Sequence, residues 1–145
     1  MIKYYIWLII LAFFHSLQEI QIEGKNGGWA RHLPTFRINV FLTNILLGKG
    51  LSGYHLFMLL MFITIFHGIF LFEQWSWKLE ALSFGLLSFY FVIEDFLWFV
   101  FNKHYGIKKF RKGKINWHKR WMLGLPTSYW WGIIIGVLLV YLGIQ

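Results

Sequence analysis

Apolar residues gather in long runs that are separated by short polar segments. The longest runs cover residues 54–72, 81–93 and 129–143, and another covers residues 4–14 near the amino terminus. A helix rises about 1.5 Å per residue and needs about 20 residues to cross about 30 Å of hydrocarbon. With their flanking residues, the runs approach or reach that length. The pattern therefore predicts membrane-spanning helices rather than a β-barrel.

Four crossings fit the pattern best, and we expect helices over about residues 2–21, 53–72, 76–102 and 128–142. Each predicted end carries a suitable signal, because residues 48–53 (GKGLSG), Ser76 and Pro126 precede the second, third and fourth helices. Aromatic residues at helix ends are typical of membrane interfaces. We assign this role to Trp75, Trp77, Tyr129, Trp130 and Trp131, and we place His55 at an interface as well.

A further apolar segment, residues 36–47, lies between the first two predicted crossings. It is interrupted by Arg37, Asn39 and Asn44, and as a helix it would be only about 18 Å long. This length is too short to span a bilayer, so we expect an interfacial or re-entrant helix. The predicted fold is an all-α integral membrane protein, with residues 1–145 forming one polytopic domain. This domain is a bundle of four transmembrane helices with the extra short helix beside it.

Composition and charge support this assignment. The chain is 58% hydrophobic and 14% charged, with a mean hydropathy of +0.56, whereas a soluble domain carries about a quarter charged residues. The net charge of +8 could suggest nucleic acid, but the basic residues cluster in loops, as expected for topology and contact with anionic lipid. We therefore expect no nucleic-acid partner. The chain has no cysteine, which excludes disulfides and thiolate sites.

The distribution of basic residues predicts the orientation of the four crossings. Only Lys3 and Lys78 would lie on one side of the bilayer. The two long loops on the other side would hold Lys25, Arg31, Arg37, Lys49, Lys103, Lys108, Lys109, Arg111, Lys112, Lys114, Lys119 and Arg120. By the positive-inside rule these loops face the cytoplasm. We predict a multi-pass protein of the cell membrane with both termini outside the cytoplasm.

Two acidic residues, Glu94 and Asp95, lie inside the third apolar run. An ionisable residue within a membrane helix is costly and indicates function. Helical periodicity places Asp95 on a small and polar stripe that faces other helices, with Glu94 about 100° round the helix. The alternative interpretation is a buried ion pair with Arg31, Arg37 or Lys103 that only stabilises packing.

The first predicted helix carries a second polar group at the same end. His15 and Glu19 are four residues apart, with Glu23 one turn further. Residues at this spacing share a helix face and can bind one metal ion together. The alternative is a His and Glu pair that reaches into the membrane interface.

The two long loops add further polar residues at this membrane depth, including Trp29 and Arg31 in the first loop and Asn102, His104 and His118 in the second. Carboxylates and imidazoles without thiolates suit zinc, iron or manganese. The predicted metal ligands are His15, Glu19, Asp95, His104 and His118. The same end could also work without a metal. In that case Glu94 or Asp95 would act as general acid and Arg31 or Arg37 would orient an anionic headgroup. With or without a metal, the predicted catalytic residues are Glu94, Asp95 and Glu19, and the predicted substrate-binding residues are Arg31, Arg37, Asn102 and Trp29.

Residues 92–99 (VIEDFLWF) resemble the Pro-x-acidic-acidic-x-x-Phe-Phe motif of the membrane-embedded lycopene cyclases. The resemblance covers eight residues, with Val92 in place of the proline and Trp98 in place of the first phenylalanine. It implies an acid-bearing helix that acts on an isoprenoid. It accounts for neither the Trp29 to Arg37 region nor the His118 region.

These features predict a small membrane-embedded enzyme that acts on a lipid or isoprenoid from the cytoplasmic leaflet, with a carboxylate and histidine site. Two alternatives remain open at this stage. One is a small proton-coupled transporter that uses Glu19, Glu94 or Asp95. The other is a structural or lipid-binding subunit of a larger membrane complex. Membrane lipids are expected partners, and the chain could form a homo-oligomer or join a complex.

Overall fold

The computed structural model describes residues 2–39, 41–46 and 50–145 and is mostly helical (68%). Four helices are long and apolar enough to cross a membrane: α1 (Ile2–Ile22), α3 (Gly53–His67) with its 3₁₀ continuation η2 (Gly68–Leu71), α4 (Trp77–Phe101) and α6 (Thr127–Ile144). The four expected helices are therefore present, and their observed ends lie within two residues of the predicted ones.

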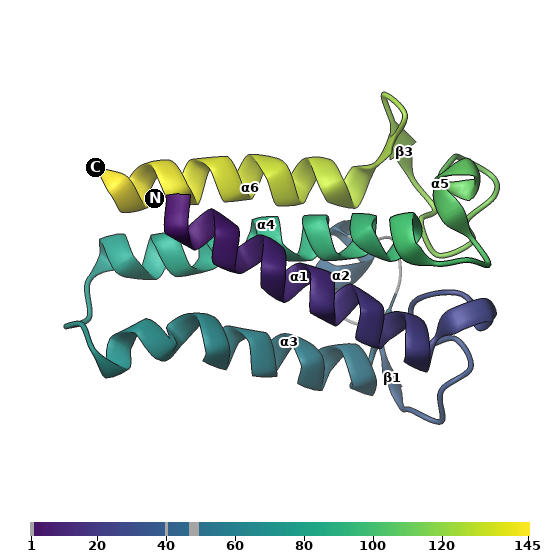
Figure 1. Ribbon diagram of the computed structural model, residues 1–145, viewed down its shortest axis with the longest axis horizontal. Coiled ribbons are helices and arrows are strands. Elements are labelled where there is room, and N and C mark those ends of the chain that lie inside the picture. The colour runs from purple at the N-terminus through teal and green to yellow at the C-terminus, as the bar shows by residue number, and fades with distance from the viewer. Residues whose placement is uncertain (1, 40, 47–49) are drawn as a thin grey trace.

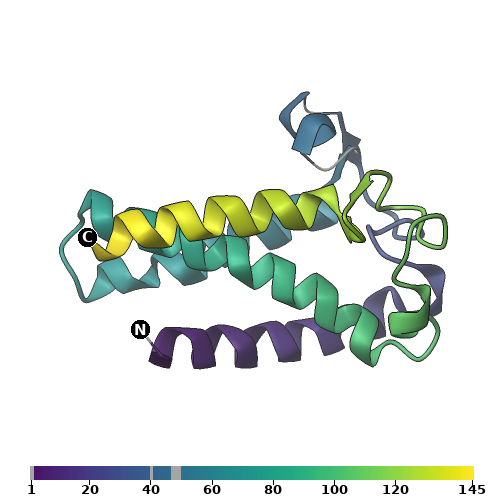
Figure 2. The ribbon, with the colours of Figure 1, turned by 90° about the horizontal axis from the view of Figure 1, so that it is seen from above.

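The four long helices run up and down around α4 (Figure 1). Helix α4 packs against α6, α1 and α3. Both termini lie at one end of the bundle, together with the short α3–α4 connection. The two long connections, residues 23–52 and 102–126, lie together at the other end, which we call the loop end. Figure 2 shows the same arrangement from above, with α1 and α6 on different sides of α4.

Side-chain caps mark where α3 and α4 begin. The Ser52 hydroxyl accepts a hydrogen bond from the His55 backbone N–H at the start of α3, and the Thr35 hydroxyl accepts one from Tyr54 N–H. Ser76 caps α4 as expected, because its hydroxyl accepts from Leu79 N–H. Such bonds satisfy backbone donors that a helix leaves unpaired at its first turn.

Small residues allow α4 and α6 to approach closely. A Cβ atom added to Gly85 of α4 would lie 2.8 Å from the backbone nitrogen of Val140 in α6. At Gly143 of α6, an added Cβ would lie 2.8 Å from the backbone nitrogen of Leu82. Close backbone contact through glycine is a common way for apolar helices to associate.

The segment between α1 and α3 differs from its prediction. Only Phe41–Leu46 form a helix (α2), while β1 (Arg37–Ile38) pairs antiparallel with β2 (Leu51–Ser52). The predicted helix start at residue 36 is therefore wrong, because Arg37 and Ile38 pair with the backbone of Ser52 and Leu51 further along the chain. Residues 40 and 47 of the predicted helix and Lys49 of the basic loops lie outside the described residues.

The connection after α4 also contains short elements that the sequence did not indicate. It includes α5 (Gly106–Lys109) and a hairpin of β3 (Trp121–Met122) and β4 (Leu125–Pro126). Leu123 and Gly124 form the hairpin turn with φ of 49° and 82°, as a two-residue hairpin loop requires. The fold is thus helical with two small two-stranded ladders rather than strictly all-α.

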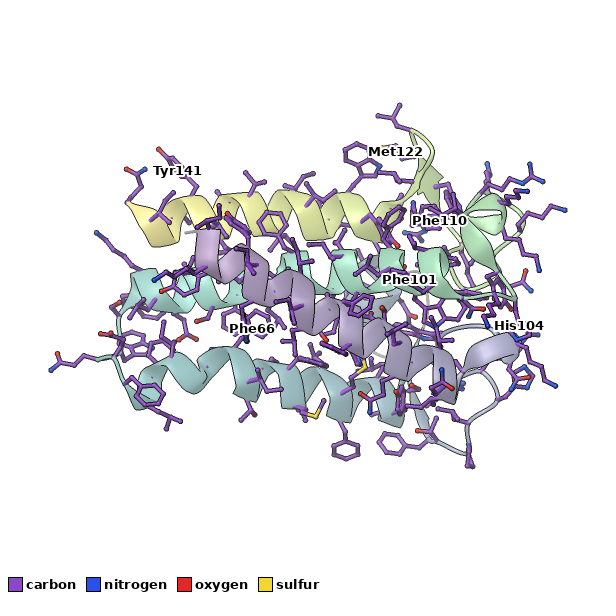
Figure 3. All side chains as sticks on the ribbon, viewed as in Figure 1. Phe66, Phe101, His104, Phe110, Met122 and Tyr141 are labelled. Carbon is purple, nitrogen blue, oxygen red and sulfur yellow. The ribbon has the colours of Figure 1, made fainter. Side chains whose placement is uncertain are left out.

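Two buried clusters hold the structure together. The first lies among the long helices and includes Leu8, Phe62, Leu86 and Tyr90. The second lies at the loop end, where Ile115 and its aromatic neighbours pack over Trp98 and Phe99 of α4. The outer faces of the long helices remain apolar and exposed. Figure 3 shows this contrast, with Phe66 between α3 and α4 and Tyr141 on the outside of α6.

Candidate functional site at the loop end

Polar side chains from α1, α3 and α4 meet near the loop end. The Nδ1 atom of His15 lies 2.7 Å from the Tyr90 hydroxyl and 3.7 Å from a Glu94 carboxylate oxygen. The other imidazole nitrogen lies 3.5 Å from Glu19. The Tyr54 hydroxyl of α3 donates a hydrogen bond to the same Glu19 carboxylate. The loop-end halves of α1 and α4 therefore meet through these side chains.

A second polar group connects α4, α6 and the loop between them. The Tyr129 hydroxyl donates to the Asp95 carboxylate over 2.5 Å, and His118 Nε2 lies 3.0 Å from the same oxygen. The His118 carbonyl accepts a hydrogen bond from the Trp121 indole at 2.7 Å. These contacts anchor the long basic loop to the side chains of two helices.

The first long loop supplies a third part of the site. The buried Glu23 carboxylate accepts a hydrogen bond from the Ala30 backbone N–H. Trp29 stacks on His55 with ring centroids 4.1 Å apart, and its indole donates to the Gly50 carbonyl at 2.8 Å. Trp29 and Ala30 both adopt positive φ, 69° and 51°, which non-glycine residues seldom do outside functional or tightly constrained turns.

The two loops also contact each other. An added Cβ at Gly27, whose φ is +88°, would lie 2.8 Å from the Tyr105 hydroxyl and 2.9 Å from the Trp117 ring. Only glycine fits this backbone at this distance. Burial raises the pKa of Tyr105, and the positive charge of Arg31 partly opposes this rise. Asn102 ties the same region together, because its side-chain amide donates to the Gly24 carbonyl at 3.1 Å.

These groups surround a cavity of about 400 Å³. It is bordered by all four long helices and by both long loops. The polar part of its wall consists of Glu19, Glu23, His55, Ser88, Glu94, Asp95, His118, Ser128 and Tyr129. The aromatic and apolar part includes Trp29, Met58, Phe91, Trp98, Trp117, Trp131 and Ile135. The cavity thus joins a carboxylate-rich end to an apolar space between α3, α4 and α6.

Glu94 differs from the other carboxylates of the cavity. It is only 7% exposed, and its carboxylate oxygen lies 3.7 Å from His15 Nδ1, which is too long for a hydrogen bond. Within the described part of the chain it makes no hydrogen bond at all. We had expected Asp95 to be the inward-facing acid, but Glu94 is the more deeply buried of the two.

The structure brings together only some of the predicted site residues. Those that line or touch the cavity group are His15, Glu19, Trp29, Glu94, Asp95 and His118. Asn102 is buried, but its side chain forms hydrogen bonds with the backbone of the two long loops rather than with the cavity group. Arg31 is exposed, and so is Arg37, whose guanidinium donates to the Ala30 carbonyl at 2.7 Å. Among the described residues, the carboxylate of Glu94 lies near His15 and that of Asp95 near His118, so a buried ion pair with Arg31, Arg37 or Lys103 stays an alternative interpretation.

The predicted metal ligands do not converge. Among residues 2–39, 41–46 and 50–145, no group of three or more His, Asp or Glu side chains is arranged to hold a metal ion. His15 and His118 contact different carboxylates, and the exposed His104 lies at the far end of the loops (Figure 3). The five-residue ligand set is therefore not assembled, and metal binding stays a prediction.

Sequence reasoning missed several residues of the site. Tyr129 and His55 were assigned to membrane interfaces, yet both are buried against the cavity. Tyr54 and Tyr90 were not considered, although Tyr90 is four residues before Glu94 and therefore on the same face of α4. That spacing could have predicted from the sequence that Tyr90 lies beside Glu94. No comparable signal marks Tyr54, whose partner Glu19 lies 35 residues away.

Comparisons with known proteins do not add to this description, because no protein family, curated protein or solved structure matches the chain. The likeness of residues 92–99 to the lycopene cyclase motif remains a local resemblance. The function must therefore be argued from the site itself.

Proposed function

We propose that this protein is a membrane-embedded enzyme whose four long helices cross the bilayer and whose cavity binds a lipid or isoprenoid. The four spans contain 18 to 25 residues each and have mean hydropathies of 1.4 to 1.9. Their outward side chains are largely apolar, including Phe57, Ile134 and Val137. Such surfaces are stable against lipid tails and unfavourable in water.

The observation that carries the enzymatic proposal is the environment of the Glu94 carboxyl group. Its carboxyl group lines the cavity, is nearly fully buried and makes no hydrogen bond to a described residue. A general acid or base must have its proton-transfer oxygen available to the substrate. The carboxylates of Glu19, Glu23 and Asp95 already accept hydrogen bonds from the protein, so we assign them to shaping and polarising the site.

The shape of the cavity favours an amphiphilic substrate. A polar end with carboxylates and imidazoles continues into an apolar space lined by Met58, Phe91 and Ile135. Small-molecule sites commonly combine an apolar wall with a few polar groups that orient the ligand. The cavity reaches the middle of the spans at Ser88 and Ile135, but its four carboxylates all lie in its loop-end part, which favours chemistry at one leaflet over transport across the bilayer.

The proposal is tested by comparing lipids from cells that express the wild-type protein, a Glu94→Gln variant or a Glu73→Gln variant. Glutamine keeps the size of Glu94 but cannot transfer a proton as a carboxyl group does, so we expect conversion to fall about 10²- to 10⁴-fold. Untargeted mass spectrometry of extracted lipids should show one species depleted and another enriched by the wild type. Glu73 is exposed in the α3–α4 connection, and its variant should behave like the wild type.

Identical lipid profiles for the wild-type and Glu94→Gln proteins, at equal protein abundance, would contradict an enzymatic role of this carboxyl group. A loss of conversion in the Glu73→Gln variant would contradict the assignment of the chemistry to the cavity.

Metal dependence is a separate prediction with its own measurement. The purified protein should be analysed for zinc, iron and manganese, together with His15→Ala and Asp95→Asn variants. Metal well below one ion per chain in all three proteins would contradict the metal prediction, which no three-ligand group among the described side chains supports. About one metal ion per chain that is lost in both variants would instead favour the metal-dependent mechanism.

A further inference from the structure

Charge is distributed unevenly between the cavity and the rest of the chain. The chain has fourteen Lys and Arg residues and only six Asp and Glu residues. No Lys or Arg is among the described lining residues of the cavity, whereas four of the six acidic residues line it: Glu19, Glu23, Glu94 and Asp95. Arg31 and Arg37, which we expected to bind substrate, are exposed. The cavity wall is therefore acidic within a strongly basic protein.

The hydrogen bonds inside the site do not neutralise this charge. Glu19, Glu23 and Asp95 accept hydrogen bonds from two tyrosine hydroxyls and one backbone N–H, and all three of these donors are uncharged. Three imidazoles also lie at the site, those of His15, His55 and His118. Even with all three imidazoles protonated, they would be fewer than the four carboxylates that line the cavity.

Glu94 supplies an observation that goes beyond the number of acidic residues. It makes no hydrogen bond to a described residue, and its side chain is only 10% exposed. Among the described residues, Trp98 Nε1 is the only fully shielded side-chain nitrogen or oxygen without a hydrogen-bond partner. The Glu94 carboxyl group therefore keeps some accessible surface, and Glu94 lines the cavity. A nearly buried carboxylate without a donor is costly, so a ligand that donates to it would be stabilised.

The charge of the wall and the need of Glu94 for a donor together restrict the headgroup of the ligand. A phosphate or carboxylate headgroup is repelled, because charges of like sign interact strongly where water is scarce. A hydroxyl group can donate but carries no charge, and a trimethylammonium group carries charge but has no N–H. A primary ammonium group has both a positive charge and three N–H donors. Hydrogen bonds between charged groups are about twice as strong as those between neutral groups.

We propose that the cavity binds an amphiphile with a primary ammonium headgroup, which donates a hydrogen bond to the Glu94 carboxylate and is attracted by the other three carboxylates. The hydrocarbon chain occupies the apolar space between α3, α4 and α6, beside Met58, Phe91 and Ile135. This inference rests on the proposed function in one respect only, that the occupant of the cavity is a lipid, and it specifies the headgroup of that lipid.

The test measures binding to the purified full-length protein in phosphatidylcholine nanodiscs. The probes share one saturated C18 chain and differ only in the headgroup: the primary amine, the alcohol, the trimethylammonium compound and the carboxylate. We expect the amine to bind most tightly. The alcohol and the trimethylammonium compound should each bind about tenfold more weakly or worse, because the first lacks the charge and the second lacks the N–H. The carboxylate should bind least.

A variant tests whether Glu94 is the group that recognises the amine. Glu94→Gln keeps the size of the side chain and removes its charge, so it should weaken amine binding roughly 10- to 100-fold. The same variant should bind the alcohol within about threefold of the wild type. Glu73→Gln is the matched control, because Glu73 is exposed in the α3–α4 connection, and it should leave both affinities unchanged.

Two kinds of lipid carry a primary ammonium group, and a further probe distinguishes them. Lysophosphatidylethanolamine with the same C18 chain adds a phosphate next to the ammonium group. Affinity within about threefold of the amine would support the proposal with an ethanolamine phospholipid as the ligand. Affinity at least about tenfold lower would support it with a long-chain amine as the ligand, because the phosphate is then repelled by the carboxylates.

Equal affinity for the amine and the alcohol would overturn the proposal, as would tighter binding of the carboxylate or the trimethylammonium compound than of the amine. Unchanged amine affinity in Glu94→Gln would also overturn it. If this variant does not fold, the comparison of headgroups in the wild type still decides. The proposed function fails separately: in that case Glu94→Gln leaves the cellular lipids unchanged while the wild type still prefers the amine.

Discussion

Two carboxylates near the loop end accept a hydrogen bond from a tyrosine in a distant part of the chain. Glu19 of α1 accepts from Tyr54 of α3, and Asp95 of α4 accepts from Tyr129 of α6. A buried carboxylate is costly unless such bonds replace its lost hydration. The tyrosines therefore stabilise the fold and leave Glu94 as the acid available to a ligand.

At the residue scale, we predict that Tyr129→Phe destabilises the protein by about 1–3 kcal/mol, because Asp95 loses a buried hydrogen-bond donor. Thermal unfolding in detergent, followed by tryptophan fluorescence, measures the effect. Tyr141→Phe is the matched control on the same helix, since Tyr141 is 55% exposed and lies on the outer face of α6 (Figure 3). Equal stability of the two variants would show that the Asp95 and Tyr129 contact contributes little.

At the scale of elements, the contact between α4 and α6 positions two walls of the cavity. Gly85 and Gly143 allow the helix backbones to approach, while Phe91 of α4 and Ile135 of α6 line the cavity nearer the loop end. The distance between these helices therefore influences the width of the apolar space as well as the stability of the bundle.

We predict that Gly85→Ala costs about 1–3 kcal/mol, because the new methyl group meets the Val140 backbone rather than a movable side-chain end. Gly68→Ala serves as the control. Gly68 has a helical φ of −56° and nothing within 4 Å of an added Cβ, so alanine should be neutral or slightly stabilising. Unfolding temperatures in detergent compare the two variants. A Gly85→Ala variant as stable as the wild type would mean that the two helices can separate at little cost.

At the scale of the whole molecule, the arrangement of the helices separates the termini from the basic loops. The termini and the α3–α4 connection lie at one end of the bundle, and the long connections lie at the other (Figure 1). The second connection alone holds Lys103, Lys108, Lys109, Arg111, Lys112, Lys114, Lys119 and Arg120. This asymmetry supports the proposed orientation, with the loop end and the cavity facing the cytoplasm.

The orientation can be tested with single cysteines, because the natural chain has none. We predict that a membrane-impermeant maleimide labels Glu73→Cys in intact cells and labels Lys112→Cys only after the membrane is permeabilised. Both positions are exposed, and labelling of denatured protein controls for expression. The reverse pattern would invert the orientation, and labelling of both positions from outside would contradict four crossings.

The sequence determined the four long helices and the end of the bundle at which the acids lie. Apolar run length, caps such as Ser76 and the clustering of Lys and Arg are local properties, so they can be read along the chain. Glu94 and Asp95 could also be recognised from the sequence, because ionisable residues are rare inside an apolar run of this length, whichever helices the run packs against.

Only the tertiary structure decided which partners these acids have. Pairs such as Tyr54 with Glu19 and Tyr129 with Asp95 join residues more than 30 positions apart. Likewise, β1 forms because residues 51–52 lie beside it, and no local pattern encodes this pairing. The cavity has the same origin, since its wall comes from four helices and two loops. Local chemistry therefore located the acids, whereas packing between distant segments decided that Glu94 has no hydrogen-bond partner among the residues that the structure describes.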